Sequence, residues 1–405
     1  MRALIVRAVV VVLLPGLAAA QTVLLTESEA LAQLSSDNPR VRRLSSGVAL
    51  ARVEVEAAGR WPNPRAAFNR EAVAGVVEQM VTVSQVLPVT GRRGFDVRAA
   101  SARLDATSQR AAGELRRLRA DLRLSFTELW LAQALERELT RSRDRLAELA
   151  AVLARREAAG DAAGFDRLRV EREAIDADAD RSGAAARRGR AQALLAGYVS
   201  SPTDPAPIEA VRPDGPRTPV PGIEELVAAA ERTRGELAAL QLEIDAAQFA
   251  ERAAERQRIP EPEVTAGTKR SNAGLGDVGS VVSVHVSVPL FDRARPERAA
   301  AQARASQLRV ELEALRRVVR ADVTAWRAAL VERRAAVDRY RDAAANADQV
   351  ERIAQVSYDA GVRGILELID AHRTASEARA RLDVLEAAVR EAEIELEFAS
   401  GWEMP

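Results

Sequence analysis

Side chains that could perform acid–base or metal chemistry are few and widely spaced in this chain. It has two histidines, His285 and His372, and no cysteine, while its 59 aspartates and glutamates are interpreted as lying on solvated helix faces. A tetrahedral metal site needs three or four Cys, His or carboxylate ligands. No HExxH, GxSxG, P-loop or dinucleotide-binding motif occurs. We therefore expect no enzyme activity, no metal site and no cofactor.

Composition narrows the class of protein further. The formal net charge is zero, which argues against a nucleic-acid partner. The chain is rich in alanine and charged residues, and only 3% of its residues are aromatic, a composition typical of long helices or coiled coils. Arg2 and Arg7, an apolar run over residues 8–14 and the small residues 18–20 predict a signal peptide over residues 1–20. We therefore expect an exported protein.

The chain contains two copies of one plan. A strand-like segment ending at Pro88 matches one ending at Pro289, 201 residues later, and Gly160 matches Gly361 at the same offset. Seven prolines between residues 202 and 221 predict an irregular linker. We therefore divide the mature chain into a first repeat (residues 21–200), a proline-rich linker (201–222) and a second repeat (223–405).

Each repeat is predicted to contain a helix, a short β-hairpin and further long helices. The hairpins are expected at residues 64–88 and 263–289, where valines alternate with polar residues. That alternation places the valines on one face and a second set of residues on the other: Thr82, Ser84, Ser283, His285 and Ser287. Strands of about nine residues have the length that a tilted membrane strand needs.

Two hairpins in one chain cannot close a pore by themselves. Unpaired strand edges are not tolerated in lipid, because no water is present to bond their backbone groups. Several chains would therefore have to pool their hairpins. The alternative is a small soluble sheet that caps a helical bundle.

The helices make up most of the predicted structure. Residues 223–257 are predicted to be helical, as are residues 28–60 with an interruption at Asn38-Pro39. From Arg295 to about Tyr358 nothing but Pro296, which a first helical turn tolerates, interrupts the pattern. Apolar residues recur there at steps of three and four: Leu308, Leu312, Leu315, Val319, Val323, Trp326 and Leu330. Such a helix would be about 90 Å long, so it must pack sideways in a bundle or a helical tube.

The plan resembles the TolC-type family of outer-membrane efflux proteins. The similarity rests on the order of several short segments and on the duplication of the plan. The first repeat contributes Glu29-Ala-Leu31 with Asn38-Pro39, and Ser84-Gln-Val-Leu-Pro88 with Gly91-Arg-Arg93. The second contributes Val288-Pro-Leu-Phe-Asp292, and Tyr358-Asp-Ala-Gly361 with residues 366–371. Within the family, Trp61-Pro-Asn-Pro64 and residues 85–93 are most similar to the CzcC-like heavy-metal efflux branch.

The resemblance implies a fold that is mainly α with a small β part. A long α-helical barrel would cross the periplasm, and a transmembrane β-barrel would be shared between the protomers of a homotrimer, with four strands per chain. The polar strand residues would line the lumen and the valines would face outer-membrane lipid. The implied function is an exit duct in the outer membrane of a Gram-negative bacterium, which receives substrates, metal cations among them, from an inner-membrane pump of the RND or ABC type through a periplasmic adaptor.

The family also implies acidic residues that narrow the periplasmic entrance. Carried over through the Gly361 turn, these positions are Glu367 and Asp370 in the second repeat, and Asp166 and Arg169 in the first. Because one of the four is basic here, Arg169 could pair with an acid and hold the entrance shut. The alternative is that all four are solvated residues at helix starts, where acids suit the helix dipole.

Two other classes of protein share part of this pattern. A periplasmic adaptor would have one helical hairpin between glycine- and valine-rich β domains, whereas an envelope tether would have unbroken heptads and no alternating strands. The duplicated plan and the valine alternation at residues 282–288 favour the channel.

Overall fold

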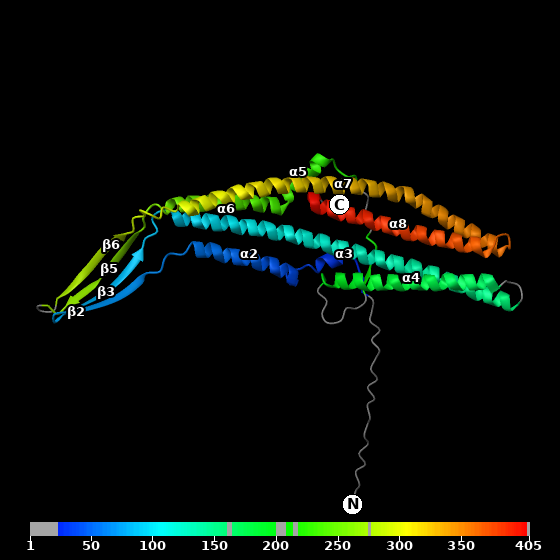
Figure 1. Ribbon diagram of the computed structural model, residues 1–405, viewed down its shortest axis with the longest axis horizontal. Coiled ribbons are helices and arrows are strands. Elements are labelled where there is room, and N and C mark those ends of the chain that lie inside the picture. Colours follow the sequence, from blue (N-terminus) through cyan, green and yellow to red (C-terminus); the bar gives the residue numbers. More distant parts are fainter. Residues whose placement is uncertain (1–22, 160–163, 200–207, 214–217, 274–276, 403–405) are drawn as a thin grey trace, which may run out of the picture. The chain divides into compact units, whose positions relative to one another are not determined.

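The computed structural model describes residues 23–159, 164–199, 208–213, 218–273 and 277–402. The signal peptide predicted for residues 1–20 and parts of the predicted linker lie outside these residues. Figure 1 shows the order of the elements, which are mostly helices, with one four-stranded sheet and a pair of short strands. The expected fold class, mainly α with a small β part, is confirmed.

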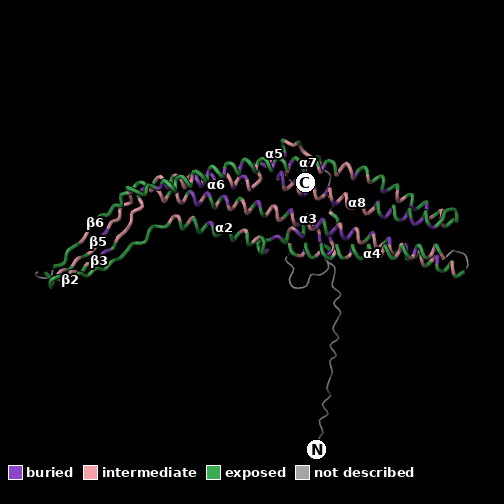
Figure 2. The backbone as a smooth tube through the Cα atoms, in the orientation of Figure 1, coloured by how far each residue is buried: buried purple, intermediate pink, exposed green. Residues whose placement is uncertain are grey.

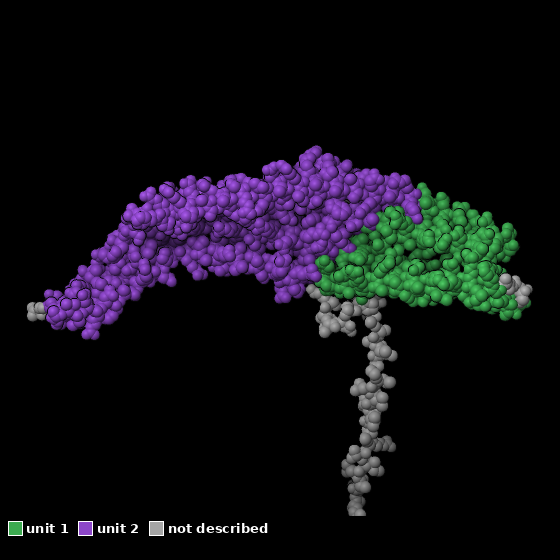
Figure 3. Space-filling view, viewed as in Figure 1, with its two compact units in different colours: residues 1–33, 125–215, 341–387 green, residues 34–124, 216–340, 388–405 purple. Residues whose placement is uncertain are grey.

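The chain forms two compact units, each containing segments of both repeats (Figure 3). Unit 1 comprises residues 1–33, 125–215 and 341–387, and unit 2 comprises residues 34–124, 216–340 and 388–405. Two very long helices supply segments to both units: α3 (Arg92–Ala158) and α7 (Arg295–Asp359). The units therefore do not follow the order of the sequence repeats.

In unit 2, α2 (Pro39–Ala58) lies beside the first part of α3. The side chain of Asn38 caps α2 by accepting a hydrogen bond of 3.0 Å from the amide of Arg40, and Pro39 occupies the first turn, where its missing N–H is harmless. An ion pair of 2.7 Å between Arg43 and Glu114 links α2 to α3. The predicted interruption of the first helix is thus a true boundary, because α1 (Glu27–Ala32) ends before Asn38.

The helix predicted for residues 223–257 is broken in two, which corrects that prediction. The structure has α5 (Ile223–Thr233) and α6 (Gly235–Arg256), separated by Arg234 in an extended conformation. Gly235 lies so close to α3 that a Cβ atom there would collide with the carbonyl of Gln109. Backbone contact between α6 and α3 therefore fixes the position at which the chain bends.

The apolar stripe of α7 packs inward as its period predicts. Leu308, Leu312, Val319, Val323 and Leu330 are buried. The end of α8 (Ile365–Ser400) joins the same unit, where Arg117 of α3 donates hydrogen bonds of 2.8 and 2.9 Å to the two carboxylate oxygens of Glu395. Fork-to-fork pairs of this kind fix orientation as well as distance.

Unit 1 contains α1, α4 (Gly164–Ala196) and the remaining parts of α3, α7 and α8. Its apolar core includes Leu146 and Leu153 of α3, Val170 of α4 and Leu368 of α8. Two short strands, β1 (Val23–Leu25) and β4 (Ile208–Ala210), pair in parallel. The sequence did not predict these strands, and β4 shows that the segment interpreted as a linker is not wholly irregular.

A four-stranded sheet lies at one end of unit 2 (Figure 1). Most residues of its strands are exposed (Figure 2). Its strands are β2 (Arg65–Val73), β3 (Val76–Val86), β5 (Pro262–Ser271) and β6 (Val278–Val286). They pair in the order β2-β3-β5-β6, all antiparallel, so the hairpins of the two repeats meet along β3 and β5. Ala74 and Gly75, both with positive φ, make the tight turn between β2 and β3.

Candidate channel surfaces

The strand register gives the sheet one polar and one apolar face. Residues that pair directly across antiparallel strands project on the same side. Thr82 pairs with Gly267 and Ser84 with Thr265, which in turn pairs with Ser283. The opposite face carries a row of apolar side chains, all exposed apart from the half-buried Val264: Phe68, Val81, Val83, Val264, Val282, Val284 and Val286.

Four of the five strand residues expected to face a lumen lie together on the polar face: Thr82, Ser84, Ser283 and His285. Ser287 is the exception, because β6 ends at Val286, whose partner Pro262 is the first residue of β5. Thr82 is buried rather than exposed, since its side chain fills the space beside Gly267.

Hydrogen bonds and ion pairs connect the strands across the polar face. The hydroxyls of Ser84 and Thr265 lie 2.8 Å apart. Arg65 of β2 reaches Glu263 of β5 at 2.9 Å, and Lys269 of β5 reaches Glu78 of β3 at 2.6 Å. The polar face therefore carries paired charges and hydroxyls, whereas the valine face is apolar over most of its length, with Arg70, Gln79 and Arg270 at the end near the β2–β3 turn.

Both outer strands of the sheet have an unpaired edge in the described chain. β2 pairs only with β3 on one side, and β6 only with β5. Every residue of β2 is exposed. Open edges of this length invite pairing with another chain, so the sheet of a single chain is incomplete.

The two helical turns of unit 1 carry the residues expected at a periplasmic entrance. The second turn follows α7, where Gly361 adopts a φ of 71°, and leads into α8. Glu367 and Asp370 are exposed on the first turns of α8, and Asp370 pairs with Arg373 at 2.9 Å. On α4, Asp166 is half-buried and Arg169 is exposed. Among the described residues, none of these four makes an ion pair with another of the four.

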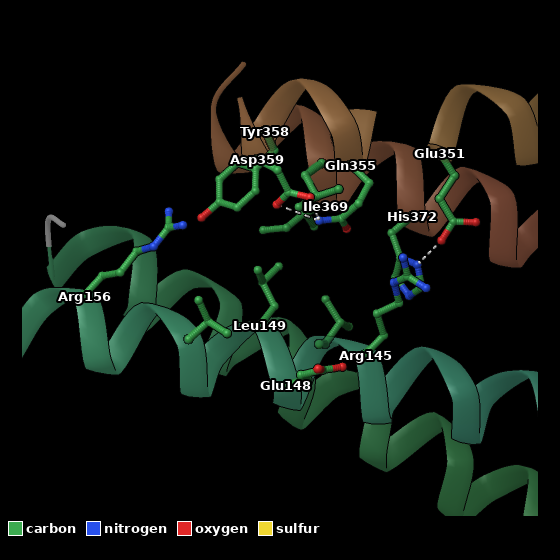
Figure 4. Close-up of a pocket in the computed structure, with 13 residues that line it drawn as sticks. Arg145, Glu148, Leu149, Arg156, Glu351, Gln355, Tyr358, Asp359, Ile369 and His372 are labelled. Carbon is green, nitrogen blue, oxygen red and sulfur yellow. Dashed lines mark hydrogen bonds and ion pairs between the residues drawn. The ribbon is translucent and has the colours of Figure 1, made fainter. Parts of the chain in front are cut away.

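A cavity of ≈ 330 Å³ lies between α3, α7 and α8 in unit 1 (Figure 4). Its walls include Leu149 and Ile369, while Arg156 and Tyr358 line the end nearest the turn, with the guanidinium 5.8 Å from the ring centroid. At the other end, His372 faces Glu351.

The sequence interpretation missed a buried polar cluster next to this cavity. Glu138 and Glu351 are only 3% and 8% exposed, which corrects the expectation that the carboxylates lie on solvated helix faces. Arg379 joins them, at 2.8 Å from Glu138 and 3.1 Å from Glu351, and also reaches Asp348 at 2.6 Å. Spacing within one helix could not reveal this cluster, because its members come from α3, α7 and α8.

This cluster shifts the ionisation of Glu351. Burial alone would raise the pKa of its carboxyl, but hydrogen bonds from His372 and Arg379 and the charge of Arg379 outweigh that effect and hold the pKa below its ordinary value. Glu351 is therefore a buried anion that is held in place by cationic and hydrogen-bonding neighbours.

No group of three or more His, Cys, Asp or Glu side chains in the described part of the chain is placed to hold a metal ion. No helix within it is both long and apolar enough to span a membrane.

Solved structures of the same fold are membrane proteins. A membrane protein from Pseudomonas aeruginosa superposes with a TM-score of 0.78 at 19% identity, covering 93% of both chains. The CmeC outer membrane channel of Campylobacter jejuni gives 0.80 at 10% identity, covering 93% of this chain and 85% of that one. The MtrE outer membrane channel of Neisseria gonorrhoeae, solved in its open state, gives 0.74 at 18% identity, with coverage of 93% and 88%.

The family model described as "Outer membrane efflux protein" matches residues 226–402, most of the second repeat. No curated protein matches the chain. The matched residues include β5, β6 and the two helices around the Gly361 turn. The described chain as a whole has the fold of the solved outer-membrane channels. Residues 226–402 therefore match the outer-membrane efflux protein family, within a chain that has the fold of such channels.

Proposed function

We propose that the chain is the outer-membrane exit duct of a tripartite efflux system, and that it conducts substrates passively. One observation carries this proposal: a four-stranded sheet with a polar face, an apolar face and two open edges forms one end of unit 2. Such a sheet suits a lipid bilayer on one side and water on the other. The channel contributes a path and a gate, and the energy comes from the pump.

Closure of the sheet requires other copies of the chain. The strands alternate in direction, so β6 of one chain and β2 of the next would also meet antiparallel. Head-to-tail repetition of this interface forms a closed ring without any unpaired edge. In keeping with the family resemblance, we propose a homotrimer.

The faces then acquire separate roles. Thr82, Ser84, Ser283 and His285 face the lumen, with Ser287 at its rim, and the valines of β6 face lipid. In unit 1, Asp166, Arg169, Glu367 and Asp370 form the periplasmic gate. An adaptor protein binds the helical turns and connects them to an inner-membrane pump of the RND or ABC type.

Because the chain has no cysteine, single cysteines can test which face lines the lumen. Ser283→Cys and Val282→Cys are neighbours on β6 that project to opposite faces. In planar lipid bilayers, a charged water-soluble thiol reagent should reduce the conductance of the Ser283→Cys channel and leave that of Val282→Cys unchanged. Equal responses of both variants, or a protein that forms no channel, would contradict the proposal.

A further inference from the structure

A groove lies where the sheet of the second repeat meets its helices. It has a volume of ≈ 750 Å³ and is formed by residues 254–260, which end α6 and lead to β5, and by residues 288–298, which lead from β6 into the first turn of α7. Five arginines line it: Arg256, Arg258, Arg293, Arg295 and Arg298. Glu255 is the single carboxylate among its lining residues, so the groove is strongly cationic.

Most of this positive charge is not neutralised within the described chain. Arg298 pairs with Glu255 at 2.9 Å and with Glu251 at 3.4 Å. Arg258 donates to the backbone carbonyl of Glu255 at 3.4 Å, and Arg256 lies over the ring of Phe95 at 5.9 Å. Among the described residues, no carboxylate pairs with Arg256, Arg258, Arg293 or Arg295.

Apolar side chains surround these charges. Leu290 is 63% exposed and Phe291 is fully exposed. Val288, which lines the groove, is also exposed and lies two residues beyond Val286, the last residue of β6. The groove thus combines cationic side chains with exposed apolar side chains next to the end of the strand.

The first repeat also has an exposed aromatic side chain and an arginine where its helices meet its strands. Trp61, between α2 and β2, is exposed, and the guanidinium of Arg93 lies 5.5 Å from the centroid of its ring. Aromatic side chains favour the boundary between hydrocarbon and water. Both junctions therefore have the composition expected at the surface of a bilayer.

We propose that the groove of the second repeat binds the phosphate headgroup of an anionic phospholipid in the periplasmic leaflet of the outer membrane. Arginine presents several N–H donors in a planar fork that fits phosphate oxygens. Acyl chains of the same lipid would lie along Val282, Val284 and Val286. The proposal rests on the proposed function, since that function places the valine face in lipid.

Lipid retention by the purified full-length protein tests this site. The protein is reconstituted in vesicles of equal parts phosphatidylglycerol and phosphatidylcholine, extracted in mild detergent, and its bound lipids are counted by native mass spectrometry. We expect the wild type to retain phosphatidylglycerol preferentially. The variant R256Q/R258Q/R293Q/R295Q should lose about a hundredfold or more of that preference, because each arginine at an anionic surface contributes severalfold to binding and the four contributions multiply.

A matched control removes the same charge elsewhere. Arg309, Arg316, Arg339 and Arg352 are exposed on α7, and among the described residues no carboxylate forms an ion pair with them. R309Q/R316Q/R339Q/R352Q should therefore keep the preference for phosphatidylglycerol. Excess soluble glycerol phosphate should not displace the retained lipid, and displacement would show a site for free phosphate esters instead.

The remaining outcomes separate this site from the channel itself. A wild-type protein that inserts and conducts but shows no preference for phosphatidylglycerol refutes the lipid site alone, as does equal loss in both quadruple variants. A wild-type protein that inserts into neither vesicle composition refutes the channel and the lipid site together. Lipid retention by the wild-type protein can refute the lipid site without any variant. The proposal can therefore be tested even if the quadruple variant does not fold.

Discussion

The imidazole Nδ1 of His372 lies 2.8 Å from a carboxylate oxygen of Glu351, and both side chains are buried between α7 and α8. An ionised carboxylate can only accept hydrogen bonds, so Nδ1 carries the proton. The other ring nitrogen lies 3.3 Å from the hydroxyl of Ser142 on α3. One histidine therefore connects three helices of unit 1.

Replacement of Glu351 should weaken unit 1. Glu351→Gln keeps the shape but removes the charge that faces Arg379 and His372, so we expect a loss of about 2 kcal/mol in the stability of this unit. The measurement is the midpoint of thermal unfolding at pH 7, followed by circular dichroism. Glu377→Gln, on an exposed side chain of the neighbouring helix α8, should leave the midpoint unchanged.

The effect of Glu351→Gln should depend on pH. Because the folded-state pKa of Glu351 is lowered, the carboxylate stabilises the fold at pH values above its unfolded pKa of about 4.3. That contribution is lost as the pH falls through the folded value. The difference between wild type and variant should therefore be full at pH 7 and shrink in strongly acidic buffer. A difference that stays constant would contradict this account.

The carboxyl group of Asp383 should affect stability with the opposite dependence on pH. Burial and the nearby Glu386 raise the pKa of its carboxyl, so the folded state favours the protonated form. Its stabilising effect is present below the unfolded pKa and is lost as the pH rises. Asp383→Asn should raise the unfolding midpoint at pH 7 by up to a few degrees, equivalent to less than about 1 kcal/mol. Asp348→Asn, which removes a partner of Arg379 at 2.6 Å, should lower it.

Periodic patterns predicted the elements of this fold because they depend on local repetition. The steps of three and four from Leu308 to Leu330 predicted the buried stripe of α7, and the alternation around Val282 and Val284 predicted the faces of β6. The break at Arg234 could not be predicted, because it depends on contact between Gly235 and α3, which is distant in sequence.

The candidate sites were predictable only where a single strand or turn defines them. Thr82, Ser84, Ser283 and His285 share a face because strand geometry fixes their direction. The cluster around Arg379 and the groove with Arg256 and Arg293 are assembled from separate segments. A list of charged residues in the sequence does not show which of them meet.

Gly267 should be essential for the pairing of β3 with β5, which joins the hairpins of the two repeats. A Cβ atom at this position in β5 would collide with the carbonyl of Val81 and come within 2.8 Å of the Cα atom of Thr82 in β3. We expect Gly267→Ala to separate β3 from β5 and prevent assembly, measured as loss of the oligomer in light scattering of the detergent-solubilised protein. Gly279→Ala in β6 is the control, because a Cβ atom there meets nothing within 4 Å. Normal assembly of Gly267→Ala would show that the strands can move apart without harm.

Removal of the exposed acids of α8 should change ion selectivity. Glu367 and Asp370 carry two of the three negative charges among the four residues proposed for the gate, and Arg169 carries the only positive one. The double variant E367A/D370A should therefore weaken cation preference, because fixed charge near a narrow entrance concentrates ions of opposite sign. The measurement is the reversal potential across a planar bilayer with a salt gradient, which should move toward zero.

The control for this measurement is E332A/D342A, which removes two exposed acids of α7 that are distant in sequence from the turn. Raised salt should reduce the difference between E367A/D370A and wild type, since screening shortens the reach of exposed charges to about 10 Å at 0.1 M and about 3 Å at 1 M. Unchanged selectivity in E367A/D370A at low salt would exclude both residues from the gate. In that case the exposed acids would serve only the first turns of α8, where negative charge favours the positive end of the helix dipole.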